Sequence, residues 1–119
     1  LEYNILLYSL SVNSNLLTTI NLSSNSDLTW LYLSGNTGLT SLDLSNNINL
    51  MILELMGNQI TSIDLSKNVN LIDLYLNGNQ FTSFDVSNNP KLQYLYLDDS
   101  SLTSLDISNL TELISLPNT

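Results

Sequence analysis

The side chains able to do chemistry in this 119-residue chain are carboxylates and phenols. Asp and Glu together number 11, Tyr numbers 6, and Lys and Arg together number only 2, while His and Cys do not occur. The chain therefore lacks the residue types that most often serve as general base, metal ligand or thiolate nucleophile. Catalysis would have to rest on the acids, on Tyr or on the two lysines.

A pair of carboxylates across a cleft is the minimum for glycoside hydrolysis. Glu54 and Asp73 are the pair that the repeat pattern described below makes neighbours. A regular open sheet offers little desolvation to raise the pKa of one of them. The sequence also lacks the G-x-S-x-G elbow and the glycine-rich phosphate loops. We therefore predict that this segment is not an enzyme and uses no cofactor.

The charge balance excludes two classes of partner. The formal net charge is −9, and the only basic side chains are Lys67 and Lys91. Nucleic acids and anionic membrane surfaces are bound through clusters of Lys and Arg, which this chain does not have. It also has no run of about 18 consecutive apolar residues. We predict neither nucleic-acid binding nor membrane insertion of this segment.

A repeat of 21 residues organises the chain. Its more uniform half, half A, opens at Leu17, Leu39, Ile60, Phe81 and Leu102, with one extra residue in the first interval. Its other half, half B, begins eleven residues after half A, starts once more at residue 113, and occupies residues 7–16, 28–38, 50–59, 71–80 and 92–101. Both halves follow the spacing L-x-x-L-x-L-x-x-N, so the repeat is nested as 11 + 10.

The unit L-x-x-L-x-L-x-x-N, present here as LMILELMGN and LIDLYLNGN, resembles the leucine-rich-repeat motif. The nested 21-residue form is similar to a class common in bacterial surface and secreted proteins. The likeness extends over essentially the whole chain. It implies a leucine-rich-repeat solenoid, a secreted or cell-surface location in a bacterium, and a ligand held on the sheet of strands.

We predict a right-handed coil of short parallel β-strands with turns and little or no helix. Residues 1–119 would form one leucine-rich-repeat domain of about five repeats, a piece of a longer protein that lacks both terminal caps. The alternating leucines would point into the coil, and stacked coils would bury them. A buried Asn would satisfy turn backbone at the ninth position, at Asn15, Asn25, Asn36, Asn47, Asn58, Asn68, Asn79 and Asn89. Gly35, Gly57 and Gly78 would allow the sharp bend before that Asn.

Half A presents nearly identical outward side chains in every repeat. They are Thr, Ser and a column of Asp at Asp43, Asp64, Asp85 and Asp106. We expect the hydroxyls to bridge neighbouring strands and the carboxylates to be solvated and hydroxyl-bonded. Stacked carboxylates would also suit Ca²⁺, although no D-x-D-x-D loop accompanies them. The sequence leaves cation binding by this column open.

Half B, in contrast, varies from repeat to repeat on its outward side. Five of the six Tyr and the only Trp fall there, together with Thr29, Met51 and several acids. Aromatic and Met clusters edged by acids have the composition of a recognition surface. The competing interpretation is that Tyr and Trp simply favour strands. Half A argues against it, because the same scaffold there needs no outward aromatic.

These patterns predict a non-catalytic protein-binding module. Its ligand-binding residues would be Trp30, Tyr32, Met51, Glu54, Asp73, Tyr75, Tyr94, Tyr96 and Asp98. The rings would serve as anchors and the three acids would select a basic or mixed partner. Two alternatives remain open: glycan binding on the same face, and a spacer without a ligand.

Overall fold

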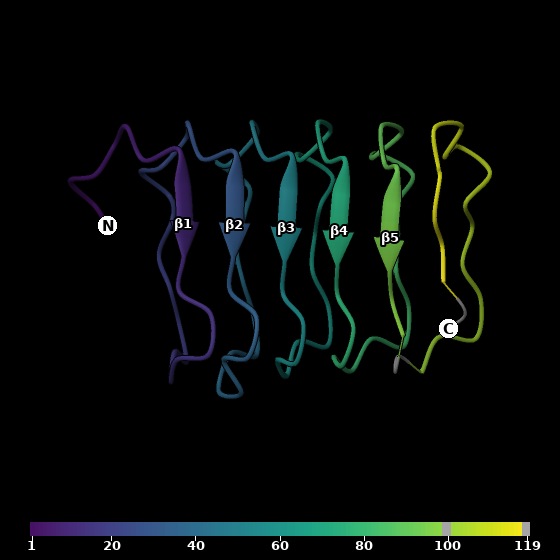
Figure 1. Ribbon diagram of the computed structural model, residues 1–119, viewed down its shortest axis with the longest axis horizontal. Helices are drawn as coiled ribbons and strands as arrows, with labels where there is room; N and C mark the ends of the chain where they lie inside the picture. The colour runs from purple at the N-terminus through teal and green to yellow at the C-terminus, as the bar shows by residue number, and fades with distance from the viewer. Residues whose placement is uncertain (99–100, 118–119) are drawn as a thin grey trace.

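The computed structural model describes residues 1–98 and 101–117. Within them, five parallel strands form one sheet in chain order: β1 (Ser9–Ser11), β2 (Trp30–Tyr32), β3 (Ile52–Glu54), β4 (Asp73–Tyr75) and β5 (Tyr94–Tyr96). Figure 1 shows them side by side, with one coil of chain leading from each to the next. The described residues contain no helix, and so no helix that could span a membrane. The predicted solenoid of short parallel strands is confirmed.

The repeat length sets the register of the sheet. Each strand has a Leu at its centre, and these leucines pair with one another from Leu10 through Leu31, Leu53 and Leu74 to Leu95. Parallel bonding continues beyond the three-residue strands, since the Leu33 N–H donates to the Glu54 carbonyl at 2.8 Å. A bridge between Tyr94 and Ser115 extends the sheet past β5. Residues 99–100 and 118–119, which the repeat pattern includes in the solenoid, lie outside the described residues.

The core is a single apolar column filled from both halves of every coil. The strand leucines Leu31, Leu53 and Leu74 are fully buried, and half A contributes Ile60 and Phe81 from the other side. Burying one such side chain contributes about 1.5–3 kcal/mol relative to leaving it exposed. The cover for each side chain comes from the coils before and after it, so one coil cannot be stable alone.

Half A is extended but forms no strand within the described residues. Figure 1 shows these segments returning behind the sheet. Backbone bonds between coils are sparse there, for example from Gln80 N–H to the Ile60 carbonyl at 2.9 Å. The prediction that half-A hydroxyls bridge neighbouring strands assumed strands that half A does not form within the described residues. Alternating side chains reveal an extended backbone but not whether adjacent backbones come close enough to pair.

Buried asparagines join each coil to the one before it. In half B, the Asn58 amide donates to the carbonyls of Leu33 and Leu55, at 3.2 and 2.7 Å, and accepts the Asn36 N–H at 2.8 Å. In half A, the Asn68 amide donates to the carbonyls of Leu44 and Asn47 of the preceding coil. Seven of the eight predicted asparagines are buried, and the prediction is confirmed for them.

Asn15 is the exception among the predicted asparagines, because it is exposed. Its amide donates to the carbonyls of Val12 and Asn13, both in its own coil. Within the described residues, no earlier half-B coil precedes it to be joined. In half B, the series of Asn bonds from each coil to the one before it, which we call the Asn ladder, thus begins at the second coil with Asn36.

A left-handed backbone residue precedes the half-B asparagine in each of the first four coils. Gly35, Gly57 and Gly78 have φ angles of 73°, 66° and 69°, and Ser14 occupies the equivalent place at 55°. A Cβ on Gly78 would also lie 3.4 Å from the Gly57 Cα. The left-handed backbone favours glycine at these turns, and the 3.4 Å separation leaves only ordinary contact distance for a larger residue at Gly78.

The one irregular interval of the repeat lies in a turn. Trp30 pairs with Ile52, 22 residues later, whereas the other strands are 21 residues apart. The extra residue falls in the exposed Thr37–Gly38 segment, after the buried Asn36. The sheet keeps its register across this insertion.

The Asn ladder predicts a large loss of stability from a single truncation. We expect Asn58→Ala to lower the free energy of unfolding by about 2–4 kcal/mol, because it leaves buried carbonyls and an N–H without partners. Asn46→Ala, at an exposed position, is the matched control and should change it by less than about 0.5 kcal/mol. Urea unfolding measures both, and equal losses would refute the role of the ladder.

Candidate binding face

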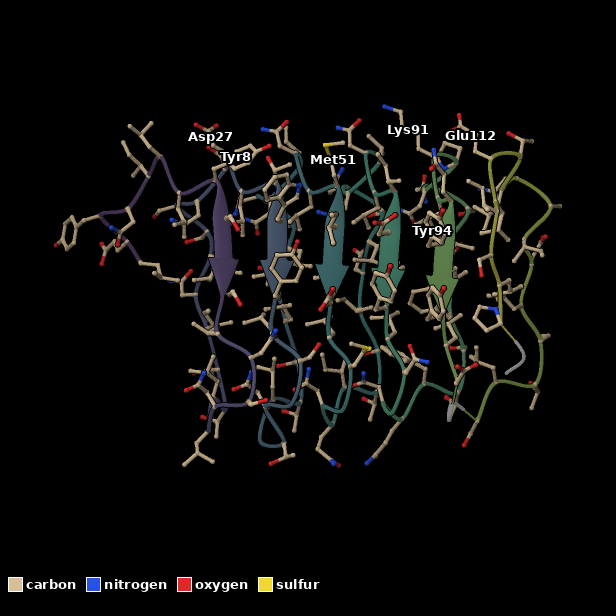
Figure 2. The ribbon with its side chains drawn as sticks, viewed as in Figure 1. Tyr8, Asp27, Met51, Lys91, Tyr94 and Glu112 are labelled. Carbon is tan, nitrogen blue, oxygen red and sulfur yellow. The ribbon has the colours of Figure 1, made fainter. Side chains whose placement is uncertain are left out.

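The outer face of the sheet is built from the residues on either side of each strand leucine. Because strand side chains alternate, these residues point away from the core. Pairing in register aligns them into two columns. Within each column, residues on neighbouring strands are about 4.8 Å apart. One column is Ser9, Trp30, Ile52, Asp73 and Tyr94, and the other is Ser11, Tyr32, Glu54, Tyr75 and Tyr96. Figure 2 shows this face toward the viewer, with Tyr94 on β5.

The aromatic rings gather at both ends of the face. Tyr8 meets Trp30 edge-on, with ring centroids 5.0 Å apart, and Tyr75 stacks on Tyr96 at 4.9 Å. Both geometries are favourable for aromatic pairs and hold the rings in fixed positions. Between the two pairs, the outward residues of β3 are Ile52 and Glu54.

The predicted site residues all lie on or beside this face, with different exposure. Trp30 and Met51 are exposed, each to 38%. The remaining predicted residues are half-buried against their neighbours: Tyr32, Glu54, Asp73, Tyr75, Tyr94, Tyr96 and Asp98. The structure therefore assembles one continuous surface, although these residues are spread over four coils.

Two outward positions of half B differ from the expected environment. Thr29 is only 7% exposed, because the larger Tyr8 and Met51 flank its position in the sheet, and its hydroxyl donates to the Asp27 carbonyl. Asp98 accepts a hydrogen bond from the Asn77 amide at 2.8 Å. Part of the Asp98 carboxylate is thus engaged within the protein.

Two acids at the centre of the face have raised pKa values. Burial raises the pKa of Glu54, and the neighbouring Asp73 carboxylate raises it further. Burial also raises the pKa of Asp73. The pKa of Tyr32 is raised by burial first and then by these two carboxylates. Ionised acids are therefore held here in surroundings that disfavour their charge.

The half-A aspartates have the opposite environment. Asp43 accepts the Ser45 backbone N–H at 2.9 Å, and this bond is the main reason that its pKa is lowered, followed by a bond from the Ser45 hydroxyl. Asp64, Asp85 and Asp106 repeat the arrangement. Asn21 makes the same backbone bond in the first coil. These side chains cap a turn in each coil, which accounts for their uniformity.

A metal site is not assembled among the side chains that the structure describes. No group of three or more Asp and Glu converges there to hold a metal ion. The capping bonds explain the Asp column through the fold itself.

A third column lies at the end of the sheet where the strands begin, and we call it the edge column. It was not predicted from the sequence. It consists of the residue directly before the first Leu of half B in successive coils: Asp27, Asn49, Asn70, Lys91 and Glu112. Figure 2 shows Asp27, Lys91 and Glu112 along this edge. With Tyr8, Met51 and Ile72, most of the column lines an open hollow. The signal was the fixed position of these polar residues in each repeat.

The edge column is held by bonds between coils. Lys91 donates to the Asn70 side chain at 2.7 Å, and the Asn70 amide donates to the Ile48 carbonyl. The Asn49 amide bonds the Ser26 carbonyl in the same way. The edge is thus a fixed polar border to the aromatic face.

Comparison with known proteins relates this architecture to two bacterial structures. Neither a protein-family model nor a curated protein sequence matches the chain. The functional domain of InlJ from Listeria monocytogenes is 34% identical, with a TM-score of 0.77 over 97% of this chain and 30% of that one. The internalin InlF from the same species is 27% identical, with a TM-score of 0.85 over 92% of this chain and 34% of that one. The chain is a leucine-rich-repeat protein.

This leucine-rich-repeat chain spans about a third of the length of either internalin structure. The InlJ domain is described as including a cysteine ladder, whereas this chain has no Cys and its buried ladders are of Asn. A structure of the Toll–Spätzle complex from Drosophila shares the fold, at 24% identity and a TM-score of 0.70 over 85% of this chain and 16% of that one.

The raised pKa of Glu54 predicts that its charge destabilises the leucine-rich-repeat fold. A raised folded-state pKa gives stability that is present at low pH and lost as the pH rises through that pKa. Glu54→Gln should therefore raise the melting temperature at pH 7 by roughly 1–3 °C, because solvent screening keeps the effect small. Thermal melts should show this gain vanishing as the pH falls below the usual Glu value of 4.5. A gain that persists in acid would contradict the explanation.

The capping aspartates predict the opposite pH dependence. Their lowered pKa values give stability that is present above the usual Asp value of 3.8 and lost as the pH falls through the lowered pKa. Asp43→Ala should lower the melting temperature at pH 7. Asp43→Asn should preserve the cap, because Asn21 makes the same bond at the equivalent position of the first coil. Replacing all four aspartates by Asn should flatten the acid limb of the stability curve. An unchanged acid limb would rule out the caps as its source.

Proposed function

We propose that this solenoid is a non-catalytic protein-binding module whose partner docks on the outer face of the sheet. The observation that carries the proposal is the contrast between the two halves of each coil. Half A repeats the same capping Asp and Ser from coil to coil. Half B places Trp30, Tyr75 and Tyr96 on a solvent-facing sheet whose backbone needs none of them.

The chemistry of the face fits a protein partner. Aromatic side chains supply large contact areas at low entropy cost, and they are enriched at the energetic centres of interfaces. Here Trp30 and Met51 are exposed. Trp30 packs edge-on against Tyr8, and the half-buried Tyr75 and Tyr96 form a stacked pair. Such a surface is largely formed before a partner arrives, which lowers the entropy cost of binding.

The charge of the face favours a basic or mixed partner. The chain carries a net charge of −9, and Glu54, Asp73 and Asp98 lie among the rings. Complementary charge speeds association and excludes acidic competitors. The likeness to Listeria internalins supports a bacterial secreted or cell-surface setting for this binding.

Glycan binding on the same face is the competing function. The edge hollow favours it, since the Asn49 and Asn70 side chains border an apolar floor that includes Tyr8 and Met51. The amides can hydrogen-bond to sugar hydroxyls, and the aromatic ring can stack on the sugar ring. We favour a protein because rings also stand on β4 and β5, outside the residues that line the hollow.

The proposal predicts that two rings can be removed with loss of binding but little loss of stability. Trp30→Ala with Tyr94→Ala should weaken binding at least about 100-fold, while the melting temperature falls by less than about 5 °C. Thr40→Ala with Thr61→Ala, on the exposed part of half A, is the matched control and should bind normally. Partners are identified on an array of purified extracellular proteins, and affinities are then measured by calorimetry.

A parallel glycan array decides between the alternatives. Signal on glycans alone would replace the proposal with the glycan function. If neither array responds and the melting temperature of the double variant falls by many degrees, the rings are structural and the segment is a spacer.

A further inference from the structure

The centre of the face combines two carboxylates with two aromatic rings. Tyr32, Glu54 and Tyr75 pair in register on β2, β3 and β4, so Glu54 stands between the two tyrosines in this column. Asp73 belongs to the adjacent column and pairs with Ile52, which places it diagonally beside Glu54. All four chemically active side chains are half-buried. They form one compact cluster, which we call the acid–tyrosine cluster.

The protein provides no cation for this cluster. Its basic side chains are Lys67 and Lys91. Lys67 lies in half A, where its charge adds to the Ser66 hydrogen bonds that lower the pKa of Asp64. The Lys91 ammonium donates a hydrogen bond to the Asn70 side chain at the sheet edge. Among the described residues, the only influences that shift the pKa of Glu54 are burial and Asp73, with no bond that favours its charge. The two acids are therefore held together without internal compensation.

The capping aspartates make this contrast sharper. Each of the four capping aspartates gains a hydrogen bond from its own coil. Glu54 and Asp73 contribute nothing comparable to the fold, and their repulsion works against it. Charged groups that weaken a fold are characteristic of sites kept for function.

The ring faces decide which cation the cluster fits. A small metal ion prefers several oxygen ligands, and no third acid joins the two among the described residues. An ammonium or guanidinium group can instead meet the carboxylates with its N–H donors and lie against the rings of Tyr32 and Tyr75. A basic side chain on a flexible stem satisfies both demands at once.

We propose that the acid–tyrosine cluster is the receptor for one Lys or Arg side chain of the protein partner. The basic group sits over Glu54 and Asp73 with Tyr32 and Tyr75 on either side. The inference rests on the proposed protein-binding function and adds the partner chemistry and its position on the sheet. The surrounding rings, Trp30 toward one end and Tyr96 toward the other, would then contact the residues that flank the basic side chain.

The test uses short peptides in place of the unidentified partner. An acetylated, amidated Gly-Arg-Gly peptide and its Lys equivalent are titrated into the intact chain at low salt. Matched neutral peptides carry citrulline or acetyl-lysine at the central position. Ring resonances of Tyr32 and Tyr75 are followed by NMR. We expect saturable shifts with the two basic peptides and none with the neutral ones.

Two double variants separate the cluster from general acidity. Glu54→Gln with Asp73→Asn should weaken binding of the Arg peptide by about tenfold or more. Asp43→Asn with Asp64→Asn removes the same charge from half A, and it should leave the affinity within about twofold. The first variant should also melt at or above the wild-type temperature, which excludes unfolding as the cause of lost binding.

Acid gives a further readout. Binding should weaken as the pH falls through the raised pKa values of Glu54 and Asp73, which lie above the usual 4.5 and 3.8. The neighbouring titratable side chains are those of Tyr32, Tyr75 and Tyr94. Burial raises the pKa values of Tyr32 and Tyr75 above the usual 10.0, so these two phenols stay protonated in this range. Equal losses in both double variants, or shifts confined to rings outside the cluster, would overturn the inference.

The outcome is separable from that of the proposed function. If the Trp30 and Tyr94 variant loses its protein partner while Glu54→Gln with Asp73→Asn keeps it, the binding face stands and the receptor inference fails. If the basic peptides bind at the cluster but no protein partner depends on the rings, the receptor stands and the wider function fails.

Discussion

No coil of this chain can bury its own leucines, and everything else in the structure depends on how neighbouring coils are joined. Hydrophobic cover brings the coils together but does not set their relative position. The buried Asn amides do so, because each bonds carbonyls in the preceding coil at defined points. The outer columns are aligned as a consequence. A slip between two coils would break several buried hydrogen bonds together with the strand ladder.

This division of labour explains why the two halves of the repeat differ so much. Half A has few backbone bonds between coils, so each coil supports its own turn through an Asp or Asn that bonds a Ser two residues later. Half B has the strand ladder and a second series of Asn bonds between coils. The backbone ladder does not depend on the side chains that point outward from the strands, so these positions can carry rings and uncompensated charge.

Most of the fold could be predicted from the sequence because the half-repeat motif occurs about ten times along the chain. The leucine spacing identified the buried residues, and the Asn and Gly positions identified the turns. Strand pairing in half A could not be read in this way, since an extended backbone pairs only where its neighbour approaches. The sheet in half B was predicted correctly because the resemblance implied where the strands lie.

The candidate face was predicted in outline, and the exceptions have a common cause. Thr29 is buried by Tyr8 and Met51, and Asp98 is bonded by Asn77, in each case by residues about 21 positions away. Such environments depend on the sizes and polarity of side chains in adjacent coils, which a pattern within one repeat does not describe. The edge column was overlooked for the same reason, because its members form a polar border only through bonds between stacked coils.

The extra residue at Thr37–Gly38 has a consequence for how such a surface can change. Because β2 and β3 remain in register despite it, chain length at this corner is uncoupled from the alignment of the sheet. Longer segments inserted after Asn36, Asn58 or Asn79 would emerge as loops beside the carboxyl ends of the strands. The solenoid could in this way acquire longer loops that border the outer face of the sheet, repeat by repeat, while every core leucine keeps its position.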